Sequence, residues 1–550
     1  MEAPRDSEEW TPYVSTRLPW SPLVPAFGLE EYGIPIPRRN AETWRHFDVA
    51  GMVEQDYSTT PVDTGIDLEL SEEEVAEYRA KLQGSGGWLE DDACTARLVY
   101  IDGRFAPQLS VTGDMANNVN SIDGVSEETK GYLARLTDGF TDTLAAPVPI
   151  NDNGGTWTSY KKLSEPNHKI GEPTSQFAIN AQQGTACFAA LNTIKTGAVA
   201  YVHAPVGQDK DIETPKPVLI VNAVSSNGSA DGKLEEGKGV AQHPRTLVVG
   251  DEGSRLAVVQ SMIDLDTGAK HVPKLYNGYT QVFVKEDANV THSYLDESGG
   301  IVTANVEVSD DDVDEGKPKP RELEAERSNL KDTHLEAIDV HLMGERARYQ
   351  GTMISIGGSG RVRIGMSVTL LKPETEAVVN GFSLAGGAQR TDMKTNIHHI
   401  ADGCTSRQLQ KNMIGGRATS AFRGRIRVEQ SAQQTDSEQL SRTILLSDRA
   451  RAWAVPSLEI IADDVQCAHG ATVSDLSEEE LFYLRSRGLS RSVARNMLMY
   501  AFAGDVSACV DPSMLAEIDS NIGLQKRIIQ RLENLVPVGE RAIRGQYQSV

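Results

Sequence analysis

The sequence is poor in cysteine, and its few cysteines are not arranged as a metal-binding or disulfide framework. The five of them, Cys94, Cys187, Cys404, Cys467 and Cys509, are scattered over 550 residues without a Cys-x-x-Cys pair. An odd, dispersed set of this kind is typical of free thiols in a reducing compartment. Long apolar runs are also lacking: none approaches the ~18 residues of a membrane-spanning helix, so we predict no membrane span.

The sequence has fewer basic than acidic residues. The chain has 54 Lys and Arg residues against 78 Asp and Glu residues, a net charge of −24. Because an acidic chain is repelled by phosphate backbones and anionic lipids, nucleic acid and membrane surfaces are not expected partners. The first residues, MEAPRDSEEW, resemble neither a secretory signal nor a transit peptide, so the protein either stays where it is made or begins after a removed presequence.

Common catalytic motifs are absent as well. There is no Gly-x-Ser-x-Gly and no His-Glu-x-x-His. Gly232 to Lys238 approaches a phosphate-binding loop, but Gly239 replaces the Ser or Thr that would hold Mg²⁺, so we expect no ATP site in this chain. The adjacent Asp463 and Asp464 would face opposite sides of a strand, which gives no catalytic carboxylate pair.

The chain does contain many short apolar runs of four to six residues, spread over roughly 300 residues between about 177 and 472. Their number exceeds the need of one sandwich, and their consecutive Val, Ile and Leu are typical of buried parallel strands. A mainly β chain with a parallel β-helix core accounts for both observations. We therefore divide the chain into a helical or mixed N-terminal domain (1–170), a β-helix core (171–474) and a helical C-terminal domain (475–550).

Local signals refine this division. Capping boxes at Ser71 and Ser477 predict helix starts, Ser490 is expected to cap a further helix, and another helix is expected from Asp511. Asp102-Gly103 predicts a hairpin turn. Two polar stretches, near 225–239 and 309–327, are interpreted as solvated insertions in the core.

One segment near the C-terminus carries the main candidate chemistry. Cys467 and His469 are two residues apart in PSLEIIADDVQCAHGAT, so on a strand they share one face. A thiolate and an imidazole suit iron or zinc, but two ligands do not complete a site, and a partner would have to supply the rest. Plain packing of a buried strand remains open for this pair. His398 and His399 are interpreted as internal histidines that diverge from each other.

Several segments together resemble the SufB/SufD family of the SUF iron–sulfur cluster assembly system. They include IPIPRRNAETWRHFDV, KPVLIVNAVS, HPRTLVVGDEGS, TILLSD, PSLEIIADDVQCAHGAT and FYLRSRGLS. The SufD branch is favoured because Ser441 stands where SufB-like chains carry a cysteine, and because His469-Gly470-Ala471-Thr472 replaces their His-Glu-Ala-Thr. Cys404 is not carried over as a ligand, since the family often has Thr there.

The resemblance implies a right-handed parallel β-helix flanked by helical domains, in a scaffold complex with SufB and the ATPase SufC. A transient iron–sulfur cluster would form at the SufB interface, with His469 as the metal ligand and Cys467 beside it. SufC would dock on helices within 477–502, and the chain itself would not be an enzyme. The plastid stroma is the expected compartment if the chain is eukaryotic, and the cytoplasm if it is bacterial.

Two other functions stay open at this stage. A β-helix enzyme acting on polysaccharides would need a groove lined with carboxylates and a secreted chain, which the free cysteines argue against. A purely structural adaptor between SufB and SufC, without a cluster ligand, is the second alternative.

Overall fold

The computed structural model describes residues 68–85, 94–111, 239–265, 272–299 and 331–507, most of 199–225, and short pieces at 47, 52, 57–58, 188, 192, 509, 527–528 and 531. The loop at 232–238, the polar stretch 309–327 and the helix expected from Asp511 lie outside these residues. No helix in the described ranges is long and apolar enough to cross a membrane.

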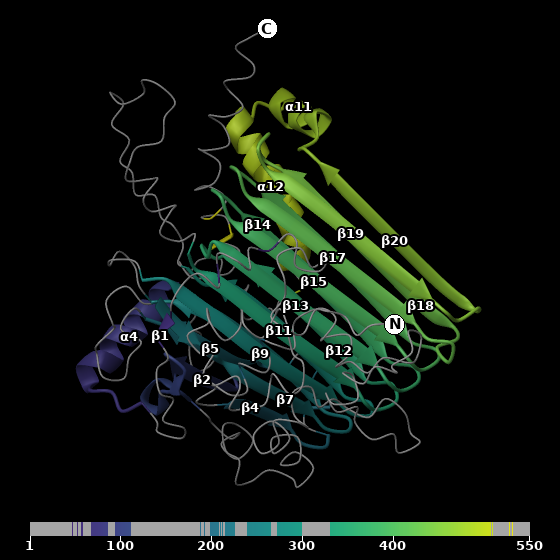
Figure 1. Ribbon diagram of the computed structural model, residues 1–550, viewed down its shortest axis with the longest axis horizontal. Helices are drawn as coiled ribbons and strands as arrows, with labels where there is room; N and C mark the ends of the chain where they lie inside the picture. Colours follow the sequence, from purple (N-terminus) through teal and green to yellow (C-terminus); the bar gives the residue numbers. More distant parts are fainter. Residues whose placement is uncertain are drawn as a thin grey trace, which may run out of the picture.

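The described strands form two ten-stranded sheets, shown in Figure 1. Sheet A contains β1 (Tyr57–Ser58), β4 (Val199–Ala204), β6 (Gly239–Gln242), β7 (Arg245–Gly250), β9 (Lys274–Val284), β11 (Thr333–Leu342), β13 (Arg361–Leu370), β15 (Arg390–His399), β17 (Thr419–Val428) and β19 (Arg451–Ile460). Sheet B contains β2 (Ala96–Ile101), β3 (Arg104–Phe105), β5 (Val218–Val224), β8 (Arg255–Asp264), β10 (Asn289–Glu297), β12 (Arg348–Ser355), β14 (Glu376–Ala385), β16 (Thr405–Ile414), β18 (Thr435–Leu445) and β20 (Val465–Ser474).

The chain winds as a parallel solenoid. From β7 to β20 consecutive strands alternate between the two sheets, so each coil adds one strand to each sheet. In sheet A, Thr333 pairs with Arg361, Arg361 with Arg390, and Arg390 with Thr419, a repeat of roughly 30 residues. All pairings between these strands are parallel except β2 with β3, which form the predicted hairpin. The predicted mainly β, parallel β-helix class is thereby confirmed, and its handedness stays a prediction.

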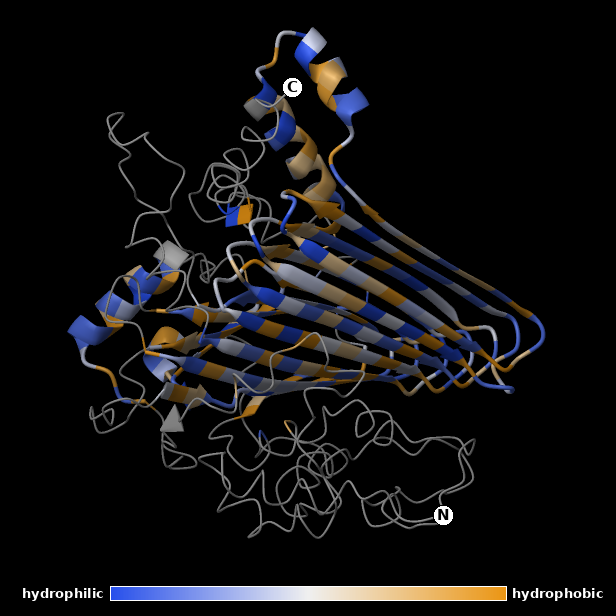
Figure 2. Cartoon of the chain, turned by 45° about the horizontal axis from the view of Figure 1, so that its top comes forward, coloured by the Kyte–Doolittle hydropathy of each residue, from blue (hydrophilic) through white to orange (hydrophobic). Residues whose placement is uncertain are grey.

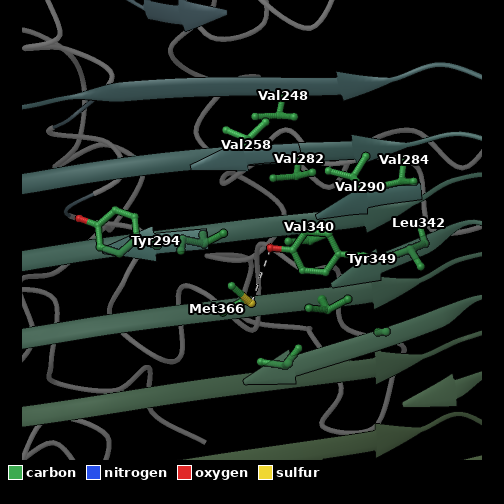
Figure 3. Packing of buried hydrophobic residues seen from close by; sticks show 14 of the residues in the cluster. Val248, Val258, Val282, Val284, Val290, Tyr294, Val340, Leu342, Tyr349 and Met366 are labelled. Atoms are coloured by element: carbon green, nitrogen blue, oxygen red, sulfur yellow. Dashed lines mark hydrogen bonds between the residues drawn. The ribbon is translucent and has the colours of Figure 1, made fainter. Parts of the chain in front are cut away.

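Aliphatic side chains fill the space between the sheets. Val282, Val340, Val368, Ile397 and Ile426 occupy successive rungs of sheet A and are all buried. Figure 3 shows part of this core, in which the Tyr349 hydroxyl donates to Met366 Sδ over 3.8 Å. Figure 2 shows the alternation of hydrophilic and hydrophobic residues along the strands that produces such rows. Burying each of these side chains stabilises the fold by about 1.5–3 kcal/mol before entropy is counted.

The helical ends are described only in part. The helix α4 (Glu72–Ser85) begins at the predicted capping box, where the Glu74 amide donates to Ser71 Oγ and the Ser71 amide donates to the Glu74 carboxylate. The short 3-10 helix η1 (Pro107–Leu109) follows the hairpin. Strand β2 comes from the segment assigned to the N-terminal domain, yet it pairs in parallel with β5 and so extends sheet B.

The C-terminal helices are α11 (Glu478–Ser486) and α12 (Arg491–Ser507). Met499, Ala503 and Val506 of α12 are buried in a cluster that also contains Ile354 and Phe382 of sheet B. Alternate residues of a strand face opposite sides of the sheet. Met353 and Val379 belong to the core between the sheets, so Ile354 and Phe382 lie on the outer face of sheet B.

Polar contacts fix α12 on that face. Lys411 of β16 donates to the carbonyl oxygen of Phe502 at 2.9 Å and pairs with Asp505. Arg495 donates to the carbonyl oxygen of Leu446 at 3.1 Å. These contacts and the apolar cluster hold α12 against the last coils, beside the end of β20 in Figure 1.

Candidate functional site

The last coil of the solenoid has open edges. Strand β20 pairs only with β18, and β19 pairs only with β17, within the described residues. Apolar side chains on this coil are exposed: Val455, Ile460, Ile461 and Val473 are 42–45% accessible. Unpaired strand edges with exposed apolar residues are a template for another chain, and proteins normally cover them.

Cys467 and His469 lie on the open strand β20, as predicted. Their Cα partners on β18 are Ser437 and Gln439, which are both buried. Cys467 packs against the core between the sheets, so this row of β20 faces inward. Cys467 is partly accessible and His469 is exposed. The pair therefore stands at the mouth of the solenoid interior, where another chain could reach both side chains.

Side-chain hydrogen bonds connect the inward-facing residues of β16 and β18, directly below Cys467 and His469. Ser437 and Ser406 share a hydroxyl hydrogen bond of 2.6 Å, and Ser406 in turn contacts His399 Nε2 at 2.9 Å. Beside this chain, Gln439 donates to the side-chain oxygen of Gln408 at 2.7 Å. The space between the sheets is thus polar directly below Cys467 and His469, whereas aliphatic side chains fill much of it elsewhere in the solenoid.

Some of these buried polar atoms have no hydrogen-bond partner. They are Gln439 Oε1 and Ser441 Oγ, each on the inner row of β18. Ser441 is the position where SufB-like chains carry cysteine, and it pairs with Ala471, two residues beyond His469. Sequence reasoning did not single out the glutamine and serine rows, because their common face depends on a register between strands about 30 residues apart.

The protonation of Cys467 limits its chemistry. Burial and, secondly, the carboxylate of Asp436 raise the pKa of the Cys467 thiol. A metal binds the thiolate, so a cation at Cys467 must displace the proton. Among the described residues, no group of three or more His, Cys, Asp or Glu side chains could hold a metal. Within the described residues, Cys467 and His469 therefore have no third side chain of this kind beside them.

The other histidine and cysteine candidates, His398, His399 and Cys404, are buried. His398 and His399 point to opposite faces of β15, as predicted, and His398 Nε2 lies 2.8 Å from Glu429. Cys404 is buried in a turn, where its sulfur lies 3.2 Å from Thr375 Oγ1. His398 and Cys404 do not reach the open edge, and His399 is hydrogen-bonded to the Ser406 hydroxyl of β16, so none of the three joins Cys467 and His469.

A second exposed surface lies on the two helices that follow β20. In α11, Phe482 is 72% and Tyr483 is 56% accessible, and in α12 Val493 and Met497 are 46% and 49% accessible. Since α12 also buries Met499 against sheet B, it carries apolar residues on two faces, of which only one is covered. Ser477 and Ser490 cap the helices as predicted, accepting from the amides of Glu480 and Val493. We call Phe482, Tyr483, Val493 and Met497 the helical patch.

Comparison with known proteins assigns this arrangement to a family. Residues 233–502 match the family described as "SUF system FeS cluster assembly, SufBD core domain". Residues 233–502 therefore form a SufBD core domain. The matched region includes the strands from β6 to β20, the open edge and nearly all of the helical pair, so both exposed surfaces belong to the SufBD core.

Individual relatives agree with this assignment. The chain is 26% identical to "Protein ABCI7, chloroplastic" of Arabidopsis thaliana over 401 residues, which are 72% of this chain and 74% of that protein. It is 24% identical to the iron-sulfur cluster assembly protein SufD of Bacillus subtilis over 402 residues, 72% of this chain and 79% of that protein. With SufD of Escherichia coli the identity is 33% over 184 residues, 34% and 41% of the two chains. The predicted function is confirmed at this level: this SufBD protein is an iron–sulfur cluster assembly protein.

Proposed function

We propose that this chain is a SufD-type subunit that helps to assemble nascent iron–sulfur clusters at an interface with SufB, in a complex whose ATPase is SufC. The observation that carries the proposal is the position of Cys467 and His469. They form an incomplete ligand pair that faces inward on an open strand edge. A partner chain that covers this edge could place its own metal ligands beside Cys467 and His469. The solenoid on its own does not require such ligands.

The interface with SufB would form by pairing along the last coil. The edges of β19 and β20 offer main-chain hydrogen-bond groups, and the exposed Val455, Ile460 and Val473 offer apolar area. The cluster is cargo at this interface. His469 would bind iron through a ring nitrogen, and the thiolate of Cys467 would stand beside it as a second, softer ligand.

The helical patch would bind SufC. Its four large side chains are exposed, and they lie on the two helices that follow β20 directly. Without an ATP site expected on this chain, hydrolysis would belong to SufC. The chloroplast and bacterial relatives fit the plastid stroma or the bacterial cytoplasm as the compartment.

The role of His469 is tested by the His469→Ala variant in a complex co-expressed with SufB and SufC. We expect an intact complex that accumulates much less iron and acid-labile sulfide. Thr472→Ala, an exposed change on the opposite face of the same strand, is the matched control and should leave cluster content unchanged. Normal iron and sulfide in the His469→Ala complex would show that this histidine has no part in cluster formation.

SufC docking is tested by point changes rather than by deleting residues 477–502, because α12 also covers sheet B. Phe482→Asp and Met497→Asp place charges in the helical patch without touching buried residues. We expect both to lose co-purification with SufC while SufB stays bound. Retention of SufC by the double variant would refute this placement, and Glu479→Lys serves as an exposed control on α11.

A further inference from the structure

The outer face of sheet A carries a group of cationic side chains on three adjacent strands. Arg363 lies on β13, Lys394 on β15 and Arg423 on β17. Lys394 pairs directly with Arg423, and Arg363 pairs with Asp392, which is two residues from Lys394 and on the same face. Neighbouring strands are about 4.8 Å apart, so the three cationic heads lie within reach of one small ligand.

The charges in this group are not balanced. Arg363 forms an ion pair with Asp392. One position further along, Arg425 donates to both oxygens of Glu459, at 2.8 and 2.5 Å, and so occupies that carboxylate. In a chain with a net charge of −24, a local excess of cations is unexpected.

Two of the cations are left without an anionic partner among the described residues: neither Lys394 nor Arg423 takes part in an ion pair there. Lys394 is only 6% accessible, and its Nζ has no hydrogen-bond partner. Burying an ammonium group without an ion-pair partner is costly: burial and the charges of Arg363 and Arg423 lower the pKa of Lys394, although the carboxylate of Asp392, already paired with Arg363, opposes the shift. Natural proteins keep such a group where a ligand or partner compensates it.

The position next to Lys394 leaves room for that compensation. Its neighbour on β13 is Gly365, and the next residue in the same row is Ala337 on β11. Among the described residues, a Cβ placed on Gly365 would meet the Glu336 carbonyl oxygen at 3.9 Å and Lys394 Cβ at 4.0 Å, which are ordinary contacts, so the missing side chain leaves a small space directly beside Lys394. Gly365 and Ala337 are partly accessible although Lys394 is buried, so solvent reaches Lys394 from this side.

We propose that Lys394 and Arg423, with Arg363 beside them, bind a small oxyanion of the phosphate class over Gly365. A compact ammonium and two planar guanidinium groups are the donors that proteins use for phosphate oxygens. The source is either free phosphate or the phosphate group of a small phosphomonoester. The site is separate from the open edge, because β13, β15 and β17 lie inside sheet A and their inner faces form the core.

The test is calorimetric titration of the full-length protein with inorganic phosphate at constant ionic strength. We expect saturable binding with a Kd of about 1 mM or lower. Lys394→Gln and Arg423→Gln should each weaken binding at least about tenfold, as the loss of one charge-assisted contact does. Gly365→Val should weaken it similarly, because the new side chain fills the open space. Phenyl phosphate, titrated in parallel, distinguishes the sources: binding of both supports a phosphomonoester site, and binding of phosphate alone supports a site for the free ion.

Controls separate this site from general charge effects. Arg390→Gln removes a positive charge from the same strand at an exposed position and should change the Kd less than about twofold. If Lys394→Gln proves unstable in thermal unfolding, Arg423→Gln at its partly accessible position carries the same test. Absence of saturable phosphate binding by the wild-type protein, or equal affinity in the Lys394→Gln, Arg423→Gln and Arg390→Gln variants, would overturn the proposal.

Discussion

A carboxyl group enclosed between the two sheets should make the stability of the solenoid fall as pH rises. Glu336 of β11 is 3% accessible and accepts a hydrogen bond of 2.9 Å from the hydroxyl of Thr280 on β9. Burial raises the pKa of Glu336 to about 8, although hydrogen bonds from Thr280 and Tyr294 oppose the rise. The side chain is therefore neutral in the folded protein at pH 7.

The sign of the effect follows from proton counting. Between pH 4.5, the ordinary value of this group, and about pH 8, the folded state keeps the proton of Glu336 and the unfolded chain releases it. The contribution of the protonated Glu336 to the free energy of unfolding is fully present below pH 4.5. It is lost as the pH rises through 8. The loss is about 1.4 kcal/mol per pH unit, and about 5 kcal/mol is its upper limit over the whole interval.

The substitution Glu336→Gln removes the titration and keeps the shape of the side chain. Urea unfolding of wild type and variant at pH 5, 6, 7 and 8 measures the difference in the free energy of unfolding. We expect the variant to gain on the wild type by on the order of 1 kcal/mol for each pH unit. Glu252→Gln, in an exposed turn, is the control and should show no trend. A difference between Glu336→Gln and wild type that does not change with pH would refute the reasoning.

Three further predictions concern acid stability, the core and the site. Burial would raise the pKa of Glu429, but hydrogen bonds with His398 and Arg427 and the charges of both partners outweigh it and hold the pKa at about 2. Glu429→Gln should therefore reduce the loss of stability seen in wild-type urea midpoints as pH falls from 4.5 towards 2. Ile338→Ala should cost about 2–5 kcal/mol in urea unfolding, against about 0.5 kcal/mol for the exposed Val455→Ala; similar costs would contradict the assigned core. Asp436→Asn should lower the pKa of the Cys467 thiol and speed its alkylation at pH 8, and an unchanged rate would show that burial alone sets it.

The strands of the solenoid were predictable, because consecutive aliphatic residues are needed wherever a parallel strand is buried on both faces. The period of its repeat could not be predicted from the sequence, because the turns between the strands carry no recurring residue. The left-handed turn position that recurs between strands of sheet A and sheet B is filled by Gly253, Asp287, Arg346, Glu374, Gly403 and Gln434. A glycine at each of these places would have marked the period in the sequence, but only two coils have one.

The same limit applies to the sites. Cys467 and His469 could be predicted, because two residues apart on one strand always share a face. The pairing of Lys394 with Arg423, and the serine and glutamine rows beneath Cys467, join strands about 30 residues apart and require the register. Likewise, the pairing of β2 with β5 joins segments separated by more than a hundred residues that no local pattern connects.

The anchoring of α12 constrains how a partner on the helical patch could act on the cluster site. Lys411 and Arg495 tie this helix to sheet B, and Met499 is buried in the same contact. A partner that pulls on Met497, which is exposed and two residues from both Arg495 and Met499, therefore pulls on the strands that support β18 and β20. Because packed cores shift between discrete arrangements rather than bend continuously, such a force would reach the open edge through sheet B. For the complex proposed above, in which SufC docks on the helical patch, we expect Lys411→Met to leave SufC bound but to uncouple ATP hydrolysis from cluster formation.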